Sequence, residues 1–77
     1  MAGEPDLAVG DSGEWVAYLQ QLLEHNGFPV SADGQFGETT KYRLEQFQQT
    51  RGLPATGAAD SATWAELTGE ATPPAYY

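Results

Sequence analysis

The chain repeats one glycine-containing corner along its length, and this repeat limits the possible folds more than any other feature. Residues 27–40 (GFPVSADGQFGETT) and 52–63 (GLPATGAADSAT) share a Gly, a large apolar residue, a Pro, a second Gly, a capping position and a Thr in the same order. Residues 10–16 (GDSGEWV) begin with a related pair of glycines. Glycine allows a positive φ angle, and a polar residue just after it can start a helix. The repeat therefore predicts short helices, each introduced by a tight corner.

Three segments carry the apolar spacing of helices. Residues 11–27 place Val16, Leu19 and Leu23 on one stripe. A second helix is predicted over residues 37–50, and a shorter third helix runs from Asp60 to Gly69. We expect an all-α, compact three-helix bundle with short Gly-rich corner loops. Its predicted core consists of Val9, Val16, Leu19, Leu23, Phe28, Phe36, Leu44, Phe47, Leu53, Trp64 and Leu67.

Capping residues predict where the first and third helices begin and end. Asp11 is predicted to cap the first helix, with Glu14 three positions later able to complete a capping box. Asn26 and Gly27 supply a left-handed stop. Asp60 is predicted to cap the third helix. We expect one domain over residues 7–69, between a disordered N-terminal tail (1–6) and a C-terminal linker or tail (70–77).

Charge and length exclude several classes of function. The 77 residues carry a net charge of −8 with only three basic side chains. Binding to nucleic acid or to an anionic membrane surface needs clustered Lys and Arg, so neither is expected. No apolar run is long enough to cross a bilayer, and the acidic start lacks the basic and apolar regions of a signal peptide.

The stretch DGQFGETT (33–40) could be a metal loop, a phosphate cradle or a structural corner. A calcium loop needs several alternating oxygen ligands, but Asp33 and Glu38 are its only carboxylates. A phosphate loop needs a Lys after its last Gly, where this chain has Glu38. We therefore predict a corner, in which Gly34 makes the turn and Phe36 enters the core.

Catalysis and metal binding are not expected. The chain has no Cys and one His, His25, which is predicted to face solvent in the last turn of the first helix. This supply cannot build a standard zinc site or a nucleophile with a placed base. We expect no enzyme activity, no cofactor and no metal.

The order of these residues resembles the peptidoglycan-binding domain family of small three-helix modules. The resemblance covers residues 7–69 and depends on three motifs. These are VAYLQQLL (16–23), DGQFGETTKYRLEQFQ (33–48) and GAADSATWAEL (57–67). Arg43 departs from the pattern, because the family places a small Ala before the position of Leu44.

The resemblance implies non-catalytic binding of bacterial peptidoglycan, through its glycan strand, its stem peptide or both. It also implies a monomeric module that is fused to, or works with, a wall-acting enzyme at the cell wall or elsewhere outside the cytoplasm. The alternative is a protein-interaction or pro-segment-like module that kept the fold and lost wall binding. A spacer without a ligand is a third possibility.

Aromatic and amide side chains on two helix flanks are the predicted ligand-binding residues. Aromatic rings stack on the C–H faces of sugars, and amides and guanidinium groups bind peptide amides and carboxylates. The candidates are Trp15, Tyr18, Thr39, Tyr42, Arg43 and Gln46. Trp15 could equally pack in the core, Tyr42 could be an ordinary surface residue, and Arg43 could pair with Glu24, Glu38 or Glu45. Gln20 and Gln48 are predicted to be hydrogen-bond struts for loop carbonyls.

Overall fold

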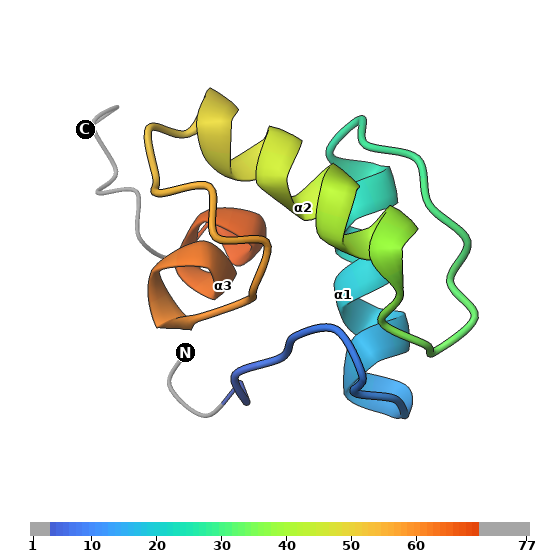
Figure 1. Ribbon diagram of the computed structural model, residues 1–77. Coiled ribbons are helices and arrows are strands. Elements are labelled where there is room, and N and C mark those ends of the chain that lie inside the picture. The colour runs from blue at the N-terminus through green and yellow to red at the C-terminus, as the bar shows by residue number, and fades with distance from the viewer. Residues whose placement is uncertain (1–3, 70–77) are drawn as a thin grey trace.

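A computed structural model describes residues 4–69 and places three helices around one core (Figure 1). The helices are α1 (Glu14–His25), α2 (Glu38–Thr50) and α3 (Ser61–Thr68). α1 packs against both of the other helices. The described residues contain no strand longer than the isolated antiparallel bridges Leu7↔Ala59 and Ser12↔Gln35. The predicted all-α, three-helix architecture is confirmed. The predicted tail at residues 70–77 lies outside the described residues.

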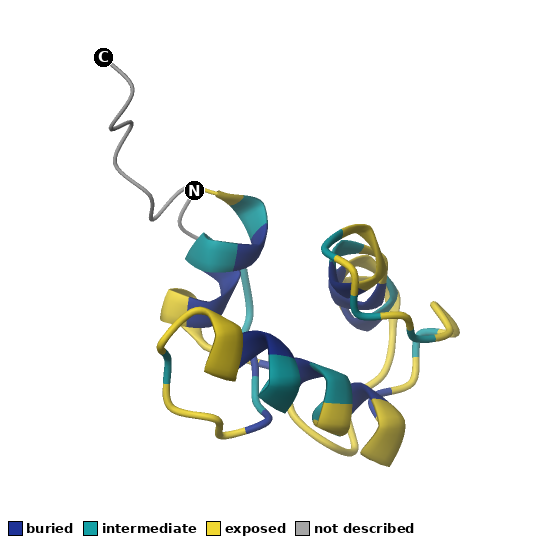
Figure 2. Cartoon of the chain, turned by 90° about the horizontal axis from the view of Figure 1, so that it is seen from above, coloured by how far each residue is buried: buried dark blue, intermediate teal, exposed yellow. Residues whose placement is uncertain are grey.

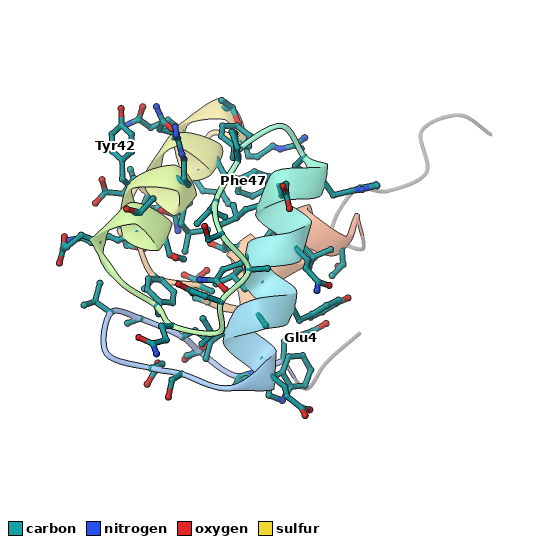
Figure 3. The ribbon with its side chains drawn as sticks, turned by 90° about the vertical axis from the view of Figure 1, so that its right-hand side faces the viewer. Glu4, Tyr42 and Phe47 are labelled. Carbon is teal, nitrogen blue, oxygen red and sulfur yellow. The ribbon has the colours of Figure 1, made fainter. Side chains whose placement is uncertain are left out.

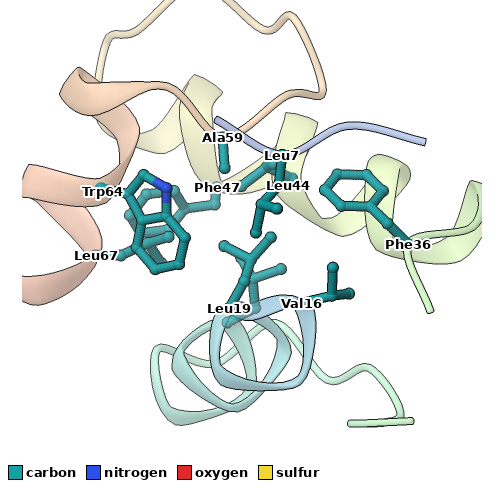
Figure 4. Packing of buried hydrophobic residues seen from close by; sticks show 10 residues of the cluster. Leu7, Val16, Leu19, Phe36, Leu44, Phe47, Ala59, Trp64 and Leu67 are labelled. Atoms are coloured by element: carbon teal, nitrogen blue, oxygen red, sulfur yellow. The ribbon is translucent and has the colours of Figure 1, made fainter. Parts of the chain in front are cut away.

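The core contains most of the apolar residues that helical spacing selected (Figure 4). Buried, as predicted, are Val16, Leu19, Leu23, Phe36, Leu44, Phe47, Trp64 and Leu67. Phe28 is partly buried against this cluster, and Leu53 is half-buried. Figure 2 shows how each helix turns a buried stripe inward and an exposed stripe outward.

Val9 was predicted in the core, and this prediction is wrong, because its side chain is 47% exposed. Leu7 is buried instead. The N–H of Leu7 donates to the Ala59 carbonyl (3.0 Å), and the N–H of Ala59 donates back (2.8 Å). This exchange fixes Leu7 against the core. The chain then turns, with Asp11 N–H donating to Ala8 O (3.0 Å), and the turn carries Val9 outward.

The stretch DGQFGETT forms a corner, as predicted. Gly34 has φ 78°, and its counterpart in the repeat, Gly57, has φ 74°. L-residues with a Cβ rarely adopt this left-handed region. Phe36 is 3% exposed and fills the core beside the corner. The stretch therefore joins α1 to α2 and sets the position at which α2 begins.

The predicted cap of the first helix is wrong, whereas the cap of the third helix is confirmed. Gly13 occupies the N-cap of α1 and supplies no side-chain hydrogen bond. The carboxylate of Asp11 accepts from Ala8 N–H (2.9 Å) instead, within the preceding turn. In α3, Asp60 Oδ1 accepts from the backbone N–H of Thr63 at 2.9 Å. α1 ends at His25, with Asn26 as its C-cap and Gly27 following at φ 93°, in agreement with the predicted stop.

Candidate ligand-binding surface

Three aromatic rings form one cluster between α1 and α3. Trp15 and Tyr18 lie on adjacent turns of α1, with ring centroids 5.9 Å apart in an edge-to-face arrangement. The buried Trp64 of α3 lies 5.8 Å from each of them, edge-to-face with Trp15 and stacked on Tyr18. Trp15 is 46% exposed and Tyr18 41% exposed, so the cluster joins the core to the surface. Such contacts stabilise ring orientation beyond simple burial.

The segment before α1 fixes one side of this cluster. The indole N–H of Trp64 donates to the carbonyl of Pro5 at 2.7 Å. Residues 4–6, assigned from sequence to a tail, thus include a residue held against α3. A pocket of about 440 Å³ opens beside the exposed rings and is lined by Glu4, Glu14, Trp15 and Tyr18. We refer to it below as the Trp15–Tyr18 pocket.

The other candidate residues lie on one flank of α2, in successive turns. The Arg43 guanidinium donates to Gln46 Oε1 (3.2 Å), and Gln46 Nε2 donates to the hydroxyl of Tyr42 (3.2 Å). Arg43 also lies 5.5 Å from the centroid of the Tyr42 ring. Its Nε is buried without a partner. These contacts of Arg43 are therefore with neighbours on its own helix. The Tyr42 side chain is 55% exposed.

Thr39 lies at the beginning of this flank, beside two pockets. One, of about 270 Å³, has a mostly polar lining that includes Gln20, Asp33 and Glu38. The other, of about 400 Å³, lies between Thr39 and the residues that follow α1. The α2 flank thus consists of Thr39, Tyr42, Arg43 and Gln46.

The structure separates the six candidates into two groups. Figure 3 shows Glu4, which lines the Trp15–Tyr18 pocket, and Tyr42 at opposite sides of the molecule. The side chains of Trp15 and Tyr18 turn toward α3, whereas those of Tyr42, Arg43 and Gln46 hydrogen-bond among themselves. The described lining of the Trp15–Tyr18 pocket includes no residue of the α2 flank. Which group binds a ligand stays a prediction.

Two buried glutamines hold the two repeated corners in the same way, as predicted. Gln20 Oε1 accepts from Gly34 N–H (2.9 Å), and its Nε2 lies within hydrogen-bond distance of Gln35 O and Thr40 Oγ1. Gln48 Oε1 accepts from Gly57 N–H (2.9 Å). Its Nε2 contacts the equivalent carbonyl and hydroxyl, those of Ala58 and Thr63.

Asp33 belongs to the first of these corners. Its carboxylate accepts from the backbone N–H of Gln35 (3.0 Å) and from the side-chain amide of Gln20 (3.1 Å). These bonds, the backbone one first, lower the pKa of the Asp33 carboxyl. The carboxylate is thus held within the corner.

Sequence reasoning missed three contributors to the Trp15–Tyr18 pocket. Glu4, which lines it, was assigned to a tail, and Glu14, which also lines it, was considered only for a capping box. Trp64, which supports the two rings, was treated as core alone. Spacing along α1 groups Trp15 with Tyr18, but it cannot show that the opposite helix stacks a ring on them. Among residues 4–69, no group of three or more His, Cys, Asp or Glu is arranged to hold a metal ion. No helix in the same range is long and apolar enough to cross a membrane.

Comparison with known proteins places this geometry in a family. Residues 12–67 match the family described as "Putative peptidoglycan binding domain". The chain is 46% identical over 55 residues to a spore cortex-lytic enzyme of Bacillus cereus, covering 70% of the chain and 21% of that enzyme. It is 39% identical over 66 residues to a zinc D-Ala-D-Ala carboxypeptidase of Streptomyces albus G, covering 79% of the chain and 25% of that enzyme. The chain therefore spans about a quarter or less of these two relatives.

Solved structures share the fold along most of the chain. The SleB N-terminal domain superposes with a TM-score of 0.82 at 38% identity, covering 87% of this chain and 93% of that domain. The endolysin of Burkholderia phage AP3 superposes with a TM-score of 0.85 at 36% identity, covering 91% of this chain and 27% of the endolysin. The motif order, the three helices and these matches agree, and the chain belongs to the peptidoglycan-binding domain family.

Proposed function

We propose that this chain binds bacterial cell-wall peptidoglycan without cutting it, and that it holds a wall-acting enzyme or assembly at the wall. The observation that carries the proposal is the family match over residues 12–67. The exposed aromatic pair gives the match a physical basis, because ring faces stack on the C–H faces of sugars. A non-catalytic role agrees with one His and no Cys in the sequence, a supply that suits no nucleophile with a placed base.

We place the primary contact in the Trp15–Tyr18 pocket and a secondary contact on the α2 flank. Trp15 and Tyr18 are held by the buried Trp64, so little side-chain entropy is lost when a ligand stacks on them. A site this small gives weak binding, of about −4 to −6 kcal/mol, which corresponds to dissociation constants from millimolar down to tens of micromolar. Tethering to a partner enzyme would then supply the effective concentration.

Pelleting with purified insoluble sacculi tests the function. The wild-type chain should sediment with sacculi, and Tyr18→Ala should reduce the bound fraction several-fold while the far-UV circular dichroism stays helical. Tyr42→Ala is the comparison variant, because it removes another exposed tyrosine from the secondary contact on the α2 flank and should reduce the bound fraction less than Tyr18→Ala does. A wild-type chain that stays in the supernatant would refute wall binding. Equal binding by wild type and Tyr18→Ala, with loss in Tyr42→Ala, would move the primary contact to α2.

The remaining parts of the proposal follow from the family. We propose that the module acts outside the cytoplasm as a monomer, with no role in nucleic-acid or membrane binding. The net charge of −8 agrees with these exclusions, because both of those partners are anionic. Size-exclusion chromatography with light scattering should give a single species near the chain mass of 8.3 kDa. A concentration-dependent dimer would contradict the monomer.

A further inference from the structure

We infer that the Trp15–Tyr18 pocket takes a primary ammonium group, so that the module selects amine-bearing wall units over acylated ones. This inference rests on the proposed function and names the chemistry recognised by its primary contact. It depends on the aromatic rings that line the pocket, on the two acidic residues that line it beside them, and on the positions of the basic side chains.

The exposed rings present faces and edges in fixed orientations. The planes of Tyr18 and Trp64 lie at 17° to each other, so Tyr18 stacks on a ring that is itself buried. Trp15 stands at 79° to Trp64 and at 68° to Tyr18. The face of an aromatic ring carries negative partial charge and attracts a cation, Trp most strongly. The same faces would accept a neutral sugar, so the rings alone do not decide the ligand.

The two acidic residues of the pocket favour a cation over a neutral sugar as the ligand. They come from separate segments of the chain. Glu14 is the first residue of α1 and precedes Trp15. Glu4 lies in the N-terminal segment, next to Pro5, whose carbonyl accepts the hydrogen bond from Trp64. The paired backbone hydrogen bonds between Leu7 and Ala59 anchor the same segment again. Glu4 therefore lines this pocket because a contact from the opposite helix holds its neighbour in place.

The three Lys and Arg side chains lie elsewhere. Lys41 and Arg43 belong to α2, and Arg51 follows that helix. None of them is among the described residues that line the Trp15–Tyr18 pocket, which hold two carboxylates and no cation. A ligand carboxylate would be repelled there, and a neutral amide would leave both carboxylates without a charged partner. A protonated amine meets opposite charge on one side and ring faces on the other.

Two components of peptidoglycan can carry such a group. One is the side-chain amine of a diamino acid in the stem peptide. The other is the amine of a glucosamine unit whose N-acetyl group has been removed from the glycan strand. The side-chain amine of the diamino acid is an ammonium ion at neutral pH. The glucosamine amine is a weaker base and is an ammonium ion at mildly acidic pH. Acetylation removes the charge of either one. Matched amine and N-acetyl probes therefore test the shared chemistry and also distinguish the two sources.

Titration at mildly acidic pH, where both amines are protonated, followed by ¹H–¹⁵N NMR, is the experiment. The glycan probes are the β-1,4-linked tetramers of glucosamine and of N-acetylglucosamine. The peptide probes are N-acetyl-L-Ala–γ-D-Glu–L-Lys, in which the Lys side chain carries the single amine, and the same tripeptide with Nε-acetyl-lysine. We expect at least one amine probe to shift the Trp15 indole N–H signal and to bind about tenfold more tightly than its acetylated partner. Raising the NaCl concentration from 50 to 300 mM should weaken that binding.

Charge-removing variants show whether the carboxylates are responsible. Glu4→Gln and Glu14→Gln should each weaken binding of the amine probe about two- to five-fold, as expected for a partly exposed ion pair. Glu24→Gln is the matched control, because it removes one carboxylate from α1 outside this pocket and should leave the affinity unchanged. Thermal melts of all three variants show whether any loss reflects unfolding.

The outcomes separate this inference from the proposed function. Equal binding of amine and acetylated probes, or equal affinities for the three Glu→Gln variants, would overturn the inference. The proposed function would still stand in that case if the chain sediments with sacculi. Failure to sediment with sacculi and to bind any probe would overturn both. Preference for one amine probe over its acetylated partner supports the inference and identifies the glycan or the peptide as the source.

Discussion

Replacing Gln48 by Leu should remove a large part of the stability of the domain. The Gln48 side chain is 1% exposed, and Leu has a similar size without polar atoms. Its amide carbonyl accepts from the N–H of Gly57 (2.9 Å). Its amide nitrogen contacts the carbonyl of Ala58 (2.9 Å) and the hydroxyl of Thr63 (3.0 Å). Leu would leave these three groups without their partner.

The expected loss follows from what each group can do afterwards. The N–H of Gly57 lies in a buried hydrogen bond and would have no partner, at a cost of about 1–3 kcal/mol. The Ala58 carbonyl keeps only a long contact of 3.4 Å with the Thr56 hydroxyl. Losing its hydrogen bond from Gln48 therefore costs about 1 kcal/mol more. The Thr63 hydroxyl can rotate toward another partner, so losing its contact with Gln48 costs less. The total is about 2–4 kcal/mol, against a folding free energy of about 4–12 kcal/mol for a chain of 77 residues.

Urea denaturation followed by far-UV circular dichroism measures this loss. Gln49→Leu is the matched control, because Gln49 is the next residue of α2 and is exposed. The midpoint should fall strongly for Gln48→Leu and change little for Gln49→Leu, with similar m-values. A loss below about 1 kcal/mol for Gln48→Leu would refute the reasoning. It would mean that the corner finds other hydrogen-bond partners when the amide is removed.

Three further predictions concern the corners and caps. Gly57→Ala should cost about 1–3 kcal/mol in urea denaturation, because the residue has φ +74° and a Cβ would lie 2.6 Å from Lys41 Cγ. Gly52→Ala, at φ +72° with open space around the Cβ, should cost only about 1 kcal/mol, and equal losses would contradict the steric part of this argument. Asp60→Ala should lower the stability by about 1 kcal/mol, and Asp60→Asn should lower it less, because Asn can still cap α3. Thermal melts measure both variants. A lower melting temperature for Asp60→Asn than for Asp60→Ala would disprove the role of the cap. Asp33 has a lowered pKa in the folded state, so its stabilising contribution is present above its unfolded pKa of about 3.9 and is lost as the pH falls through the lower folded value. Asp33→Asn should therefore flatten the stability–pH curve below about pH 4, and an unchanged curve would exclude this source.

The helices and corners could be predicted because their causes are local. Helical spacing selects Leu19 and Leu44 for the core, and both are fully buried. A glycine beside polar residues predicts a corner at Gly34 and Gly57, and both have positive φ. The Asp60 cap is equally local, because its partner lies three residues away. Each of these features is decided by residues within one or two turns of each other.

Features set by distant partners could not be predicted. Val9 and Leu7 are apolar neighbours, and only the pairing of Leu7 with Ala59 decides which of them enters the core. Asp11 has the chemistry of a helix cap, but a nearer turn uses its carboxylate. Glu4 lines a pocket because Trp64 binds the carbonyl of the residue after it. Contacts of this kind join segments that are separated in sequence, and no local pattern records them.

The two repeated corners also limit where a ligand can be recognised. Gln20 and Gln48 are among the residues that match the family pattern, yet both are buried and their amides bond to corner backbone and to Thr hydroxyls. Polar groups that are already satisfied inside the fold have no capacity left for a wall polymer. Selectivity must then come from exposed side chains outside the corner networks. Trp15 and Tyr18 meet that condition, and the buried Trp64 packs against both of their rings. We therefore propose that recognition takes place on α1 rather than at the buried glutamines of the family motif.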